Sequence, residues 1–153
     1  MFSIPGRIAL VSIMLLTVLA ACAPLPAAGS PIAIESVWAR SSPAAADTAA
    51  FYLIIRNSGA EEDALTGARS AACRAVELHE SYQAGSGMMG MRPVSGGAIV
   101  LSARDKVELK PGGLHIMCIG KQVDFRAGVI LSLTLQFQKA GDQIVEVEIT
   151  EER

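Results

Sequence analysis

The residues of this sequence best suited to chemistry are its two histidines and the methionines near them. Of the six methionines, Met1 and Met14 fall in the N-terminal apolar segment, and the rest lie in the same part of the chain as His79 or His115. Those four are Met88, Met89, Met91 and Met117. No methionine remains elsewhere in the sequence to fill a hydrophobic core, which is this residue's usual role. Their segregation therefore favours a binding site over packing.

The spacing of these residues indicates how they come together. His115 and Met117 are two residues apart, so an extended strand places both side chains on one face. The segment from His79 to Met91 contains two glycines and can loop back to bring its ends together. Its Met-Met-Gly-Met run is hard to explain as core, because turns lie at the surface. These features predict one site built from both segments.

The donor types indicate which ion such a site binds. A thioether is a soft, uncharged ligand that pairs with a soft ion of low charge. Two imidazoles and two thioethers suit four-coordinate Cu(I), whereas zinc sites ordinarily add thiolate or carboxylate ligands. Thioethers also suit an oxidising compartment, where paired thiols tend to form disulfides. The predicted ion is Cu(I), and the uncharged ligands favour a carrier that releases it.

The N-terminus predicts export and lipid anchoring. Arg7 precedes an apolar run, residues 8–20, that is too short for a stable transmembrane helix. The run ends in Leu19-Ala20-Ala21-Cys22, which resembles the lipobox of bacterial lipoproteins. We therefore expect a signal peptide over 1–22 with lipidation at Cys22, a flexible tether over 23–31 and a working domain over 32–153. An ordinary secretory signal or an uncleaved anchor is the alternative. The predicted location is extracytoplasmic, on a bacterial membrane, facing the periplasm or the cell surface.

The charge and composition exclude several kinds of function. A net charge of −2 and a pI near 5.7 leave no basic face for nucleic acid. Two histidines and no G-x-S-x-G motif give no candidate for a hydrolase. We expect a monomeric, non-enzymatic protein of one domain.

The part of the sequence after residue 31 predicts an all-β domain. Short segments with strand character alternate with turn clusters rich in glycine, and no window there has helical periodicity. The predicted strands are Ile32–Arg40, Phe51–Asn57, Ala75–His79, Ala98–Leu101, Lys106–Lys110, Leu114–Ile119, Val129–Gln138 and Ile144–Thr150. Regularly spaced short strands are typical of a β-sandwich or a small Greek-key barrel.

The full motif resembles that of a known family. Val76-Glu-Leu-His79-Glu80 is followed by ten residues, then Met91-Arg-Pro-Val94 and finally His115-Ile-Met117. Residues 37–153 thereby resemble the periplasmic copper chaperone family PCuAC, whose motif is written H(M)X10MX21HXM. The resemblance implies a cupredoxin-like β-fold and the Cu(I) ligands His79, Met91, His115 and Met117. It also implies delivery to the CuA centre of cytochrome c oxidase, so the expected partner is that oxidase subunit or another copper carrier.

The sequence departs from the family motif in three ways. Position 80 is Glu where the family often has Met, so Glu80 is interpreted as a solvated residue, or one that supports a ligand, and not as a ligand itself. The gap between Met91 and His115 holds 23 residues instead of 21. Met89 is two residues before Met91 and is expected to pack beneath the site, with ligation or a part in transfer as alternatives.

The two cysteines of the domain, Cys73 and Cys118, leave a choice open. An exported protein often joins such a pair, but two buried thiols are an equal alternative. Cys118 follows Met117 directly, so a strand turns it to the opposite face, toward the core.

Other functions compete with a copper chaperone. One is electron transfer by a blue-copper protein, which requires a thiolate ligand. Others are copper scavenging or tolerance, and a structural lipoprotein without a metal.

Overall fold

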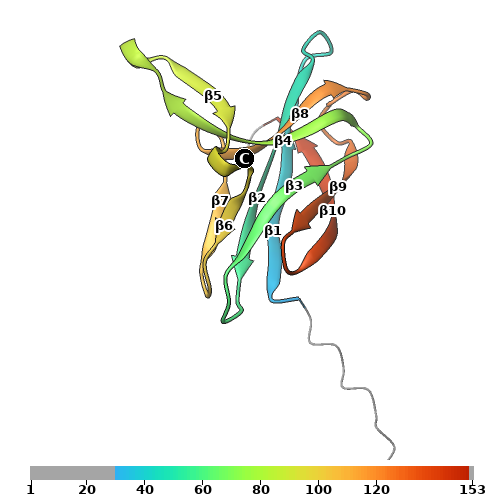
Figure 1. Cartoon of the computed structure of the whole chain (residues 1–153). Coiled ribbons are helices and arrows are strands. Elements are labelled where there is room, and N and C mark those ends of the chain that lie inside the picture. Colours follow the sequence, from blue (N-terminus) through green and yellow to red (C-terminus); the bar gives the residue numbers. More distant parts are fainter. Residues whose placement is uncertain (1–29, 152–153) are drawn as a thin grey trace, which may run out of the picture.

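The computed structural model describes residues 30–151, which fold almost entirely as β-strands (Figure 1). The strands are β1 Ile32–Arg40, β2 Thr48–Asn57, β3 Asp63–Arg69, β4 Cys73–Gln83, β5 Met89–Pro93, β6 Ile99–Leu101, β7 Lys106–Leu109, β8 Leu114–Lys121, β9 Ile130–Phe137 and β10 Gly141–Thr150. Short 3-10 turns cover Gly85–Gly87 and Ser95–Gly97. The predicted all-β class is confirmed.

The eight predicted strands are all present: β1 has the predicted bounds, and the other seven have shifted ends. Two further strands, β3 and β5, were not predicted. Gly67 interrupts β3. The β5 sequence Met-Gly-Met-Arg-Pro contains a glycine and a proline, the two residue types that strand interiors usually exclude. Pairing with β4 overrides this weak local preference in β5.

The strands pair in the order β5-β4-β8-β2-β1-β10-β9-β3-β6, with β7 added on β2. The first half of β2 pairs with β8 and its second half with β7. Among the described strands β1 and β10 are parallel, and the remaining pairs are antiparallel. Because β3, near one end of this order, packs on β4, near the other, the sheet folds over and encloses a core.

The core consists mainly of aliphatic side chains from one face of the central strands. Phe51 of β2, Ile116 of β8 and Leu133 of β9 are completely buried. The ring of Phe51 meets Phe125 edge-on, with centroids 5.7 Å apart. Each such side chain contributes about 1.5–3 kcal/mol by leaving water. This core holds β2 and β8 in place, and their opposite face is free to carry a site.

A disulfide joins Cys73 to Cys118 and resolves the choice left open by the sequence. Cys118 faces the core, as predicted. Cys73 reaches the core because β4 is irregular there: Arg74 and Ala75 are both exposed, which shifts the in–out alternation by one residue. The pairing opposite Arg74 is missing, where Gly120 has a φ of 66°. The disulfide ties β4 to β8 behind the face that carries the histidines.

Asp63 is a buried carboxylate that joins β3 to the turn between β9 and β10. Its oxygens accept backbone N–H bonds from Ala64, Lys139 and Ala140 at 2.7–2.9 Å. Burial by itself raises the pKa of Asp63, but these three donors and the charge of Lys139 together outweigh it and lower the pKa below its ordinary value. The carboxylate thus replaces missing strand partners at this corner of the fold.

The predicted signal peptide, the lipidation site Cys22 and tether residues 23–29 lie outside the described residues. Between residues 30 and 151, no helix has the length and apolar character needed to span a membrane. The division into signal, tether and domain stays a prediction.

Candidate metal centre

Strand β8 places His115 and Met117 on one face, as their spacing predicts. In the ladder with β2, Met117 is opposite Ala50. His115 is only 3% exposed and Met117 is partly buried. Cys118, the next residue, points into the core and is held in the disulfide. Its sulfur is therefore not available as a thiolate ligand on the site face.

Strand β4 brings His79 directly opposite His115 in the β4–β8 ladder. Directly paired residues point to the same face of a sheet. The two imidazole rings have centroids 5.9 Å apart and planes inclined by 66°. Two histidines 36 positions apart in sequence thus become neighbours through strand register alone.

The hairpin of β4 and β5 adds two methionines to the same face. Met91 pairs with Ser81, and Met89 pairs with Gln83. Ser81 and Gln83 follow His79 at intervals of two, so all of these side chains lie on one side of the hairpin. The predicted looping of the segment between His79 and Met91 is confirmed. In Figure 1 this hairpin extends away from the other strands.

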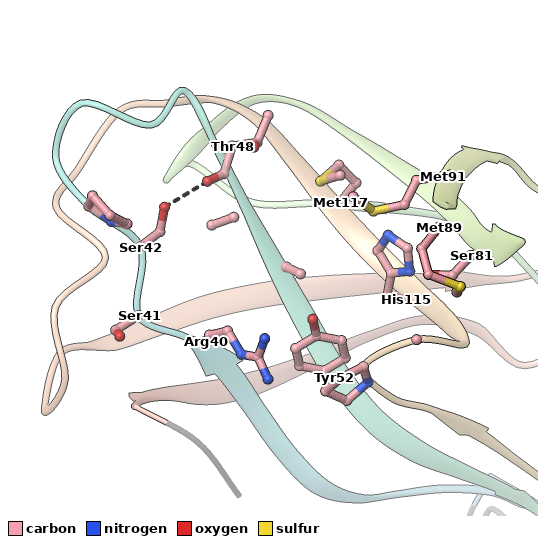
Figure 2. Close-up of a pocket in the computed structure, with 16 residues that line it drawn as sticks. Arg40, Ser41, Ser42, Thr48, Tyr52, Ser81, Met89, Met91, His115 and Met117 are labelled. Atoms are coloured by element: carbon pink, nitrogen blue, oxygen red, sulfur yellow. Dashed lines mark hydrogen bonds between the residues drawn. The ribbon is translucent and has the colours of Figure 1, made fainter. Parts of the chain in front are cut away.

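An open pocket of about 380 Å³ is lined by Met89, Met91, His115 and Met117. Figure 2 shows Met89, Met91 and Met117 gathered around the imidazole of His115. His79 is not part of the pocket lining and borders His115 from the next strand. The far end of the pocket is polar and includes Arg40.

A hydrogen bond orients each imidazole ring through one nitrogen and leaves the other nitrogen of that ring without a partner among the described residues. Nδ1 of His115 lies 3.0 Å from the carbonyl oxygen of Gly113, which makes Nδ1 the N–H donor. Nε2 of His79 lies 2.8 Å from Oε2 of Glu77. Within residues 30–151, the remaining nitrogens, Nε2 of His115 and Nδ1 of His79, are buried and have no hydrogen-bond partner. Buried polar atoms are rarely left unpaired, so these two are the atoms expected to bind an ion.

The surroundings of His115 favour its neutral form. Burial lowers the pKa of His115 most, and the charge that His79 carries when protonated lowers it further. The bond to the Gly113 carbonyl acts in the opposite direction and only partly compensates. A metal binds the unprotonated nitrogen, so the lowered pKa leaves this ligand available below the pH at which a free histidine is protonated.

Two neighbours of the site were not singled out from the sequence. Glu77 precedes His79 by two residues on a strand, so its spacing was a usable signal. Tyr52 has no such signal: its ring lies 6.5 Å from that of His115 and 4.6 Å from that of Trp38 only because β1, β2 and β8 are neighbours. Burial raises the pKa of Tyr52 despite the opposing charge of Arg40, so the phenol stays neutral.

The structure also places Glu80 and Met89, which lie next to the predicted ligands in the sequence. Glu80 points to the other face of β4 and pairs with Arg92, with its Oε1 2.8 Å from Nε. The expectation that Met89 packs beneath the site is wrong: its side chain is 57% exposed and lines the pocket. Met89 lies away from the core because β5, among the described strands, pairs only with β4 at the end of the sheet.

Known proteins share this fold and sequence pattern. Residues 32–149 match the family model described as "Putative lipoprotein LpqE-like". The chain belongs to the LpqE-like lipoprotein family. A relative of this LpqE-like chain, "Putative lipoprotein Lxx21020" from Leifsonia xyli subsp. xyli (strain CTCB07), is 29% identical over 118 residues, which are 77% of this chain and 69% of the relative.

Solved PCuAC domains resemble the LpqE-like chain in structure. The copper-bound PCuAC domain from PmoF2 is 27% identical, with a TM-score of 0.65 over 80% of this chain and 94% of that domain. The apo PCuAC domain from PmoF1, at 22% identity, shows the same fold with a TM-score of 0.66 over 78% of this chain and 93% of that domain. The predicted resemblance to PCuAC proteins and the cupredoxin-like sandwich are confirmed.

Proposed function

We propose that this chain binds one Cu(I) ion through His79, Met91, His115 and Met117 and carries it to another protein. The pair of buried, unpartnered imidazole nitrogens on facing strands supports this most strongly. Thioethers of Met91 and Met117 lie on the same face, so the donor set is soft and uncharged. The copper-bound PmoF2 domain, with a similar fold at 27% identity, agrees with copper as the ion.

The protein's own residues supply the geometry for binding. The Gly113 carbonyl and the Glu77 carboxylate each hold one imidazole with its free nitrogen available. Both sulfurs and both nitrogens are neutral, so the four ligands themselves do not compensate the single positive charge of Cu(I). The Glu77 carboxylate, bonded to His79, places a negative charge beside the site without binding the ion. An ion held this way, beside an open pocket, can be passed on by ligand exchange.

A blue-copper electron-transfer protein is the less favoured alternative. Such a site needs a cysteine thiolate with two histidines. Both described cysteines, Cys73 and Cys118, are joined in a disulfide at the core face. The four proposed Cu(I) ligands, in contrast, all face the pocket or its border.

We further propose that the recipient is the CuA-bearing subunit of cytochrome c oxidase, with scavenging or tolerance as the competing use. The support is the His79 to Met117 motif and its likeness to PCuAC proteins. We also propose that Cys22 carries a lipid and that the segment before residue 32 tethers the domain to a membrane from the outer side. Family naming as lipoproteins supports this location.

Cu(I) titration against a chromophoric chelator tests the proposal. We expect tight one-to-one binding. We expect the loss of Cu(I) affinity in His115→Ala/Met117→Ala to exceed the roughly 10- to 100-fold that is typical of removing a group hydrogen-bonded to a ligand. Equal affinity in wild type and the double variant would refute the site. Transfer from the loaded protein to a soluble oxidase copper domain then separates delivery from storage, because tight binding without transfer favours storage.

A further inference from the structure

The face that carries the four proposed copper ligands also carries a further thioether, that of Met89. Met89 lines the same pocket as Met91, His115 and Met117, and His79 adjoins them. Two imidazoles and two thioethers already complete a four-coordinate set. The surplus thioether has no packing role that accounts for it, because its side chain is 57% exposed.

Strand register sets the position of Met89 relative to the proposed ligands. Met89 and Met91 are alternate residues of β5, so they share a face and their backbones are about 6.7 Å apart. A methionine side chain has three rotatable bonds and can cover much of that distance. Met89 is one step farther from the histidines and closer to the hairpin tip.

Side chains on the opposite side of the β4–β5 hairpin support the orientation of Met89 and Met91. Tyr82 pairs with Gly90 on the opposite side, and a Cβ at position 90 would come within 2.7 Å of the Tyr82 ring. The guanidinium of Arg92 lies 4.8 Å from the centre of that ring and bonds to Glu80. The glycine lets the ring lie flat against the strand, so the two flanking thioethers project toward the pocket.

We propose that Met89 is a fifth copper-binding donor that takes over the ion from Met91 during release; this inference rests on the proposed function. One Cu–S bond to Met89 forms as the Cu–S bond to Met91 breaks. Copper remains Cu(I), and the neutral thioethers exchange no proton. The ion moves toward the exposed end of the hairpin, where a soft donor of the recipient can reach it.

The test separates equilibrium binding from transfer in the purified full chain in mild detergent. Met89→Leu keeps a similar volume without the sulfur. Met88→Leu is the matched control, because Met88 is 67% exposed, lies next to Met89 and does not line the pocket. Cu(I) affinity is measured by competition with bathocuproine disulfonate, and the transfer rate by stopped-flow absorbance with the same chelator in excess.

We expect Met89→Leu to change the affinity by less than about threefold and to slow transfer by about tenfold, with Met88→Leu unchanged in both. A wild-type transfer rate in Met89→Leu overturns the inference alone. An affinity loss as large as that of Met91→Leu also overturns it, by making Met89 a resident ligand. Wild type that binds no Cu(I) removes the proposed function itself.

Discussion

Strand β8 and the β4–β5 hairpin carry the two halves of the proposed site, and they hold their donors differently. β8 pairs with a strand on each side, and its His115 is 3% exposed. Within the part of the chain that the structure describes, β5 ends the sheet and pairs only with β4, and its Met91 is 59% exposed. Sheet edges with few buried contacts open more readily than central strands. From this difference we expect β8, together with the His79 end of β4, to fix the affinity of the proposed site, and β5 to govern release.

Single substitutions in the two halves are expected to differ most in their effects on Cu(I) affinity and on folding stability. His115→Ala is expected to lower Cu(I) affinity more than 100-fold and to cost about 1–3 kcal/mol of folding free energy, because the ring is buried. Met91→Ala is expected to lower affinity by about tenfold, since Met89 lies nearby, and to change stability by less than about 0.5 kcal/mol. Chelator competition and thermal unfolding of the apo-proteins measure both quantities. Equal stability losses would break the comparison.

Substitution of Glu77, whose carboxylate bonds to His79, is expected to have the next largest effect on Cu(I) affinity. Glu77→Ala removes the acceptor that holds the His79 ring, and we expect a 10- to 100-fold loss of Cu(I) affinity, about the usual cost of losing such a partner. Glu80→Ala is the matched control on the same strand, because Glu80 points to the other face and bonds Arg92. An identical result for both variants would show that Glu77 acts only through surface charge.

The pH dependence of His115 is the smallest expected effect. Burial holds its pKa below the ordinary value of 6.5, so the unfolded chain binds more protons than the folded protein just below that pH. The apo-protein should therefore have its full stability above about pH 6.5 and lose some as the pH falls through the lowered pKa. Proton NMR titration of the ring gives the midpoint directly. A midpoint at or above 6.5 would contradict the buried, neutral state of the β8 half.

Local sequence signals account for much of the fold and part of the site. The His115-Ile-Met117 spacing places both donors on one face wherever that segment is extended, and Cys118 then faces inward. β5 escaped prediction because Gly90 and Pro93 resemble a turn, although the strand exists through its pairing with β4. The disulfide likewise depended on an irregularity at Arg74 and Ala75 that alternation does not reveal.

The sequence by itself determined which donors are present: it groups two histidines with every methionine after the N-terminal segment, and their softness favours Cu(I). Residue types and spacings of two carry that information, because they are local. Only the tertiary structure decided that His79 faces His115, that Glu77 and Gly113 each leave one nitrogen free, and that Met89 is exposed. Those facts follow from the register between strands distant in sequence, which the packing of the whole core sets.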